Sequence, residues 1–280
     1  MAFLRVVEVF PPTIPAAGVG GSDPEAKEPI ESFVRSIREI RDLADVVLVA
    51  SLKKPGLYTL PTIDSALRLR KKLGVDAAPV LLVRDKDRLQ LLSSVVAGLV
   101  GGLKSMMLVW GDADKSLRPP TIIGFAGLSD ALAKASEVRE KARSRCLFFA
   151  PVDLRRLFTT AGVALARDRL KAGASMLLAQ PPTTDADETF DSHSRLVAKA
   201  GLDGKVLPNV FPFRSPQDVS ECEKYFGWRL PKRLHASAKE GEASLLATQK
   251  DVVRRLRSEH FPGVYVSTRG DPSYARTLLS

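Results

Sequence analysis

Cysteine is scarce in this sequence, and long apolar runs are missing. Cys146 and Cys222 are the two cysteines among 280 residues, too few for a disulfide framework or a cysteine metal site. No stretch reaches the roughly 18 uninterrupted apolar residues of a membrane span. The first apolar run, Val6 to Phe10, is too short for a signal peptide and is closed by Pro11-Pro12. These absences lead us to expect a cytoplasmic protein without a membrane partner.

Histidine is scarce as well. The three histidines, His193, His235 and His260, lie in segments predicted to be helical or polar, away from the predicted strand ends. We therefore expect neither a histidine-based metal site nor a Ser-His-Asp triad. The glycine-rich stretch from Pro15 to Asp23 lacks the lysine and hydroxyl residue of a phosphate-binding loop, and we interpret it as a plain loop.

The formal net charge of +10 invites a nucleic-acid interpretation, but the positive residues are scattered. Lys and Arg occupy the polar sides of several predicted helices and are mixed with Glu and Asp. A nucleic-acid surface requires clustered charge or interleaved aromatic side chains. We therefore expect a small-molecule partner and no nucleic acid. A positive field favours anionic cofactors and phosphorylated or polyglutamylated substrates.

Eight short apolar segments recur along the chain, each followed by an amphipathic helical pattern. The predicted strands are Leu4–Phe10, Val46–Ala50, Pro79–Val83, Ser105–Trp110, Cys146–Ala150, Ser175–Ala179, Val206–Phe211 and Gly263–Ser267. The polar segment His235–Glu242 is predicted to be a connection before the last long helix. This alternation favours a single (β/α)8 TIM barrel of the α/β class over residues 1–280, rather than a doubly wound sheet with a second domain.

Glu8 and Gln180 are the polar residues whose positions are most informative. Glu8 interrupts an apolar strand, where it shares one face with Val6 and Phe10. A buried carboxylate is costly unless it is paired or protonated, so Glu8 either has a hidden partner or serves chemistry, and we favour chemistry. Gln180 closes an apolar strand at its carboxyl end, where ligands bind in parallel α/β folds. The alternative is that Gln180 only caps the Pro-Pro turn that follows.

Other polar residues follow the carboxyl ends of the predicted strands and would converge with Glu8 and Gln180 in a barrel. They are Ser51, Asp85, Asp112, Asp153, Arg214 and Thr268. A pair such as Glu8 and Asp112 can divide into a proton donor and a charge partner, but carboxylates and amides also form general hydrogen-bonding linings. Arg214 or Arg269 is a candidate for holding an anion.

Five motifs in chain order resemble the methylenetetrahydrofolate reductase family. They are VEVFPP at 7–12, VWGD at 109–112, KAGASMLLAQ at 171–180, VLPNVFPF at 206–213 and GVYVSTR at 263–269. The resemblance implies a flavoprotein oxidoreductase of one-carbon metabolism and methionine biosynthesis. Such an enzyme reduces a methylene-tetrahydropterin, for example a folate, to the methyl form. FAD is the implied cofactor, and NADH or NADPH is the implied hydride donor.

The resemblance also implies roles on the pterin side. Glu8 matches the general acid that protonates the pterin nitrogen, a role that needs a carboxyl pKa raised by an apolar setting. Asp112 matches a catalytic carboxylate near flavin and pterin, and Gln180 matches the amide that binds the pterin ring. The aromatic residue that stacks on the pterin aligns with Pro216, and Phe213 is close enough to replace it.

On the flavin side the resemblance implies cofactor contacts for Asp112, Trp110, Ala150 and Arg169. Arg169 keeps the charge of a lysine that contacts the FAD phosphates. Four positions differ from the family pattern, namely Ala50, Val80, Trp110 and Val152. These differences leave several outcomes open: FAD bound with Trp110 stacking on its ring, another hydride carrier, a partner subunit or homo-oligomer, or a pterin-binding or regulatory barrel without redox activity.

Overall fold

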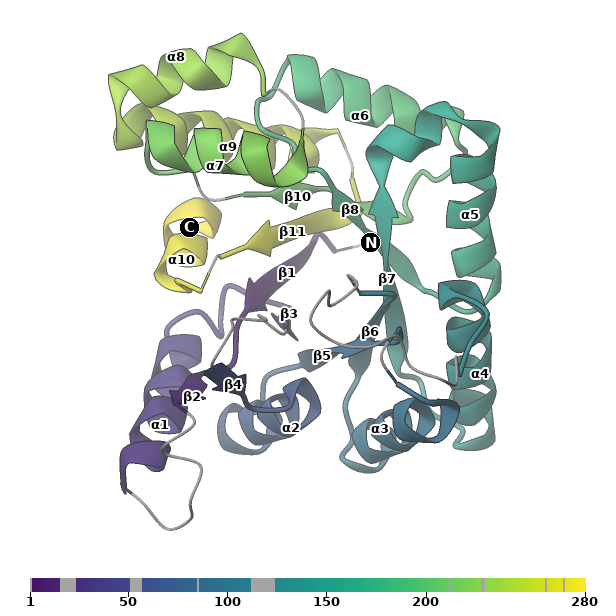
Figure 1. Cartoon of the computed structure of the whole chain (residues 1–280). Coiled ribbons are helices and arrows are strands. Elements are labelled where there is room, and N and C mark those ends of the chain that lie inside the picture. The colour runs from purple at the N-terminus through teal and green to yellow at the C-terminus, as the bar shows by residue number, and fades with distance from the viewer. Residues whose placement is uncertain are drawn as a thin grey trace.

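A computed structural model describes residues 2–15, 24–50, 57–84, 86–111, 124–211, 213–227, 230–259, 261–268 and 270–280. Parallel strands occupy its centre, and helices surround them (Figure 1). The strands are short and apolar on both faces. Both faces are buried, because helices cover the outer face and the opposite strands of the barrel cover the inner face.

The strands pair in parallel in one continuous order. That order is β10 (Asn209–Val210), β11 (Gly263–Ser267), β1 (Leu4–Val9), β3 (Val46–Val49), β5 (Ala77–Leu82), β6 (Ser105–Val109), β7 (Leu147–Asp153), β8 (Met176–Gln180) and β9 (Val206–Leu207). Pro208 separates β9 from β10, because proline has no amide hydrogen to donate to a ladder. β9 pairs with β8, and β10 pairs with β11. The sheet therefore closes on itself, and the predicted (β/α)8 barrel is confirmed.

Helices connect the strands and cover the outside of the barrel (Figure 1). They are α1 (Pro24–Arg38), α2 (Thr62–Leu73), α3 (Arg88–Val100), α4 (Leu128–Lys141), α5 (Thr160–Lys171), α6 (Glu188–Lys199), α7 (Pro216–Phe226), α8 (Lys232–Glu240), α9 (Glu242–Ser258), α10 (Ser273–Leu279) and the 3-10 helix η2 (Leu154–Phe158). A small antiparallel sheet of β2 (Thr13–Pro15) and β4 (Leu57–Thr59) was not predicted. In these ranges no helix combines the length and the apolar character that crossing a bilayer requires.

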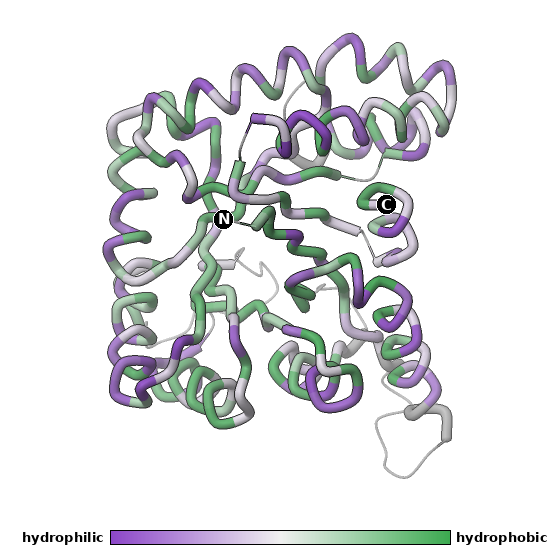
Figure 2. Tube along the Cα trace, turned by 180° about the vertical axis from the view of Figure 1, so that it is seen from behind, coloured by the Kyte–Doolittle hydropathy of each residue, from purple (hydrophilic) through white to green (hydrophobic). Residues whose placement is uncertain are grey.

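Side chains along each strand alternate between two apolar layers. Val6, Leu48 and Phe149 point into the barrel and belong to the apolar cluster that fills its interior. The adjacent Val7 and Val47 point outward and pack against the helices. Figure 2 shows the same division, because hydrophobic residues predominate along the strands while the helices alternate between hydrophobic and hydrophilic residues.

Among the predicted boundaries that differ from the structure, two stand out. The strand expected to end at Ala150 continues to Asp153, because β7 pairs with β8 as far as the Asp153 and Gln180 register. The segment His235–Glu242, predicted as a connection, lies within α8 and the start of α9. Its helical spacing was obscured by charge, but Leu234 of α8 is buried in a second apolar cluster with Phe213 and Leu245.

Candidate functional site

Glu8 lies near the carboxyl end of β1 and points into the barrel, since its partner in register, Leu48 of β3, packs in the interior. The Tyr265 hydroxyl donates a hydrogen bond to Oε1 of Glu8 at 2.6 Å, and the Ser267 hydroxyl donates to Oε2. The Thr268 hydroxyl donates to the Glu8 carbonyl oxygen at 2.6 Å. Strand β11 and the residue after it therefore fix both the carboxyl group and the backbone of Glu8.

Burial raises the pKa of the Glu8 carboxyl above its ordinary value, and the Ser267 and Tyr265 hydroxyls oppose that rise only in part. Burial and the nearby Glu8 also raise the pKa of Tyr265 well above its ordinary value, so this phenol stays protonated and donates at neutral pH. A carboxyl with a raised pKa keeps its proton closer to neutrality, as a general acid requires. Glu8 is only part-buried by surface area, so a ligand at the mouth can reach it.

Other inward-facing polar residues continue from Glu8 around one side of the barrel mouth. Ser267 ends β11, Asn209 pairs in register with Tyr265, and Gln180 ends β8. We call Glu8, Ser267, Asn209 and Gln180 the polar arc. The Gln180 side chain is exposed, and its amide makes no hydrogen bond to any described residue. The structure thus brings Glu8 and Gln180 to the same end and the same face of one barrel, and leaves the amide available to a ligand.

Asn209, like Ser267, is a member of the polar arc that sequence reasoning missed. Its side chain is 2% exposed, and within the described part of the chain its Oδ1 atom has no hydrogen-bond partner. Its carbonyl oxygen accepts a hydrogen bond from the Thr183 amide at 2.7 Å, which ties the loop after β8 to β10. A buried acceptor without a partner costs free energy. The signal was available, because Asn209, like Glu8, interrupts an apolar strand.

The opposite side of the mouth is apolar as far as the structure describes it. Ala50 after β3, Val80 of β5 and Val109 of β6 point into the barrel and pack in its interior. We call these three residues the apolar arc. Four predicted site residues lie outside the described residues, namely Ser51, Asp85, Asp112 and Arg269.

The described residues that the resemblance assigned to the cofactor face the helices. Trp110 packs against the outer layer, with the Arg84 guanidinium 5.8 Å from its ring centroid. Ala150 is fully buried in the same layer, on the outward face of β7. Arg169 of α5 donates to the Pro151 carbonyl oxygen, and burial lowers its pKa. These side chains pack toward the helices rather than into the barrel interior, so the described residues give no support to the cofactor that the resemblance implies.

Phe213 lies in the second apolar cluster rather than at the mouth. It is 1% exposed and packs with Leu230 and Leu245 among α7, α8 and α9. The Gln249 side chain accepts from the Phe213 amide at 3.4 Å and donates to the Phe213 carbonyl oxygen at 3.0 Å. Its ring therefore presents no face to a pterin in this arrangement, and stacking by Phe213 requires the cluster to open.

Asp153 and Arg214, two other predicted strand-end residues, already have charged partners. Asp153 pairs with Arg155 at 3.0 Å and caps η2 through the Arg155 amide. Arg214 pairs with Asp271 at 2.8 Å, and its guanidinium lies 5.2 Å from the Tyr274 ring centroid. Among the described residues, no group of three or more histidine, cysteine or acidic side chains is placed to hold a metal ion.

Fold and site together define a (β/α)8 barrel with a protonatable carboxyl at its mouth. Solved structures of this fold are numerous, since 495 chains match, so the fold alone assigns no function. One of them is described as "Uncharacterized protein from Clostridium thermocellum binds two copies of 5-methyl-5,6,7,8-tetrahydrofolic acid". It is 12% identical, with a TM-score of 0.65 over 99% of this chain and 96% of that chain, which shows a shared fold. Neither a family model nor a curated protein matches the sequence.

Proposed function

We propose that the barrel mouth binds a reduced folate or a related tetrahydropterin. The observation that carries the proposal is the Glu8 carboxyl, which Tyr265 and Ser267 hold on the inner face of the barrel and whose pKa is raised. The folate-binding barrel of similar fold supports the same ligand class. The proposal therefore joins a site that is visible in this chain to a ligand that a similar barrel accommodates.

The polar arc has the hydrogen-bonding groups that a pterin ring requires. The ring presents both donors and acceptors along its edge, and an amide side chain offers both kinds of partner. Gln180 supplies one amide, and Asn209 supplies a buried acceptor that lacks a protein partner. In its protonated form Glu8 adds an O–H donor, and in its ionised form it adds two acceptors.

The finer proposal is an oxidoreductase that reduces a methylene-tetrahydropterin to its methyl form. Proton donation from Glu8 to a ring nitrogen opens the five-membered ring of the substrate to an iminium, which then accepts a hydride. General acid catalysis contributes roughly 10²- to 10⁴-fold, so Glu8→Gln is expected to lower turnover by about that factor. FAD, with NADH or NADPH as the donor, belongs to this finer proposal through the family resemblance alone.

A second candidate is a pterin-binding or regulatory barrel of similar fold without redox activity. The outward placement of Trp110 and Ala150 favours it, because both side chains pack toward the helices rather than into the barrel interior. The absorption spectrum of the purified protein, before and after incubation with FAD or FMN, separates the two candidates. A flavin band supports the reductase. Protein that stays colourless after reconstitution supports the binding barrel.

Calorimetric titration with 5-methyl-5,6,7,8-tetrahydrofolate tests the shared proposal. We expect saturable binding by the wild type and nearly unchanged binding by Glu140→Gln. If the chain is a reductase, a separate activity assay should show loss of turnover in Glu8→Gln. Glu140 is a matched control, since it is an exposed glutamate on α4. A wild type that binds neither this folate nor its methylene form contradicts the proposal.

A further inference from the structure

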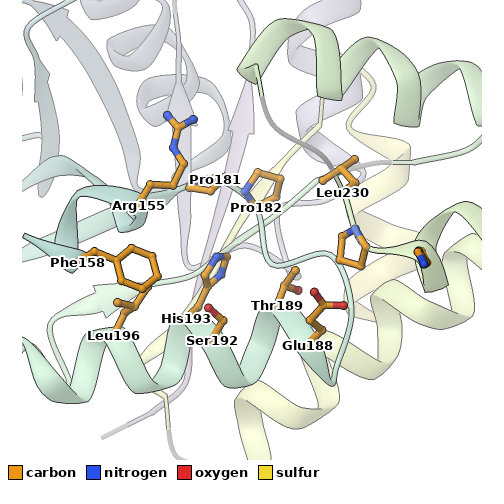
Figure 3. A pocket seen from close by; sticks show the side chains of 12 residues that line it. Arg155, Phe158, Pro181, Pro182, Glu188, Thr189, Ser192, His193, Leu196 and Leu230 are labelled. Carbon is orange, nitrogen blue, oxygen red and sulfur yellow. The ribbon is translucent and has the colours of Figure 1, made fainter.

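A cavity of about 450 Å³ lies beside the barrel mouth, among the loop after β8, helix α6 and the start of α8 (Figure 3). Its volume falls within the roughly 300 to 1,000 Å³ of ligand pockets. Pro181 and Pro182 line it, and they directly follow Gln180 of the polar arc. The cavity therefore adjoins the mouth at the strand end where we propose that the pterin ring binds.

The far wall of the cavity carries an aromatic ring that the protein leaves uncovered. Phe158 of η2 is 72% exposed, although it lines the cavity together with the buried Leu196 of α6. Figure 3 shows the Phe158 ring beside Leu196 on the same side of the cavity. An exposed apolar ring gains free energy when another surface covers it, and an aromatic ligand is the best match in shape and in stacking geometry.

His193 of α6 adds a neutral polar group to the lining. Its ring lies between Phe158 and Pro182 in Figure 3, and its Nδ1 atom is 3.0 Å from the Thr183 hydroxyl. Burial lowers the pKa of His193 to about 4, against an opposing effect of Asp185, so the ring is neutral at pH 7. Its Nε2 atom makes no hydrogen bond to any other described residue. The expectation that His193 lies away from the strand ends is therefore wrong, because α6 folds back beside the loop that follows β8.

The rim of the cavity holds one cation without a fixed partner. Lys232, the first residue of α8, is exposed and forms no ion pair with any other described residue. Arg155 also lines the cavity, but Asp153 balances its charge. Glu188 at the start of α6 contributes a charge of opposite sign. A ligand anion at this rim is therefore attracted by Lys232 and repelled by Glu188.

The cavity walls are tied to the rest of the fold. The Thr189 hydroxyl accepts a hydrogen bond from the Thr184 amide at 2.9 Å within the loop after β8. Asp187 of the same loop forms an ion pair with Arg233 of α8. On the other wall, Glu223 accepts from the Leu230 amide at 2.7 Å. A cavity with fixed walls can bind without first paying an ordering entropy.

We propose that this cavity binds the aromatic carboxylate tail of the ligand whose pterin ring lies at the mouth, namely the aminobenzoyl-glutamate half of a folate. The inference rests on the proposed function and extends it to substrate class. Phe158 covers the benzoyl ring, His193 hydrogen-bonds the amide linkage, and Lys232 attracts the carboxylates. The site consequently selects tailed folates over simple tetrahydropterins.

The test compares two ligands on matched variants. Calorimetry measures the affinities of 5-methyl-5,6,7,8-tetrahydrofolate and of tail-less 6-methyl-5,6,7,8-tetrahydropterin for the wild type, Lys232→Glu, Phe158→Ala and the control Lys239→Glu. Lys239 is an exposed lysine on the same helix that does not line the cavity. We expect Lys232→Glu to weaken folate binding roughly two- to fivefold, the size of an exposed ion pair. Phe158→Ala is expected to weaken it by about three- to tenfold.

The tail-less pterin distinguishes the two proposals. We expect its affinity to be the same for the wild type and for all variants, and lower than the wild-type affinity for the folate. Equal folate affinities in the wild type, Lys232→Glu and Phe158→Ala overturn the tail site but leave the proposed function intact. Equal losses for both ligands also overturn it. A wild type that binds neither ligand overturns the proposed function itself.

Discussion

The two sides of the barrel mouth differ in the kind of residue that the strands point inward. On the polar arc, Glu8, Ser267, Asn209 and Gln180 occupy positions that could have been apolar. The apolar arc continues the hydrophobic interior to the strand ends as far as the structure describes it. A barrel closes with either kind of residue at its rim, so closure does not require the polar arc, and we propose that this side serves the ligand.

The comparison also explains why the two parts of the family resemblance have different support. Two residues matched to the pterin, Glu8 and Gln180, lie on inward faces near strand ends, whereas Phe213, also matched to the pterin, packs away from the mouth. The described residues matched to the flavin, Trp110 and Ala150 among them, pack toward the helices. Within the described residues, inward-facing side chains therefore support the proposed pterin roles of Glu8 and Gln180 but not the proposed flavin roles.

The largest expected effect concerns the apolar interior beneath both arcs. Phe149 is fully buried inside the barrel, so Phe149→Ala should lower the free energy of unfolding by about 3 to 5 kcal/mol. Urea denaturation measures this loss. Gln180→Ala at the exposed rim is the contrast, and we expect it to stay within about 0.5 kcal/mol of the wild type. Equal losses would mean that the rim is structural.

A smaller effect of opposite sign is expected on the polar arc. Asn209→Leu removes a buried acceptor that lacks a protein partner, so it should raise the free energy of unfolding by about 1 to 3 kcal/mol while weakening folate binding. The converse change on the apolar arc, Val80→Asn, should lower the free energy of unfolding. Denaturation and calorimetric titration of the same samples check both. A destabilised Asn209→Leu variant with unchanged folate affinity contradicts the assignment of Asn209 to the ligand.

The smallest effect is a dependence on pH. The folded-state pKa of Glu8 lies above its ordinary value of 4.5, so the folded protein keeps this proton to higher pH than the unfolded chain does. The contribution of Glu8 to the free energy of unfolding is therefore complete below pH 4.5 and is lost as pH rises through the folded-state pKa. Relative to Glu8→Gln, the wild type should lose free energy of unfolding as pH rises from 4.5 through the folded-state pKa of Glu8. Glu140→Gln should follow the wild type, and a constant difference between wild type and Glu8→Gln would show that the Glu8 pKa is unshifted.

Sequence reasoning identified the barrel because eight short apolar segments alternate with amphipathic helical patterns, and both patterns are local. It also located Glu8, since a carboxylate in such a strand is conspicuous. It could not find the Tyr265 and Ser267 partners of Glu8, because their contact depends on β11 closing the barrel beside β1. His193 was missed for a related reason, since its place beside Pro182 depends on how α6 packs against the loop after β8.

The central claim is that one ligand contacts Glu8 and Gln180 together across a single barrel mouth. A crystal structure of the protein soaked with 5-methyl-5,6,7,8-tetrahydrofolate tests it most directly. We expect the pterin ring within hydrogen-bond distance of both the Glu8 carboxyl and the Gln180 amide. A ring bound elsewhere on the molecule, with the polar arc filled only by water, would contradict the account.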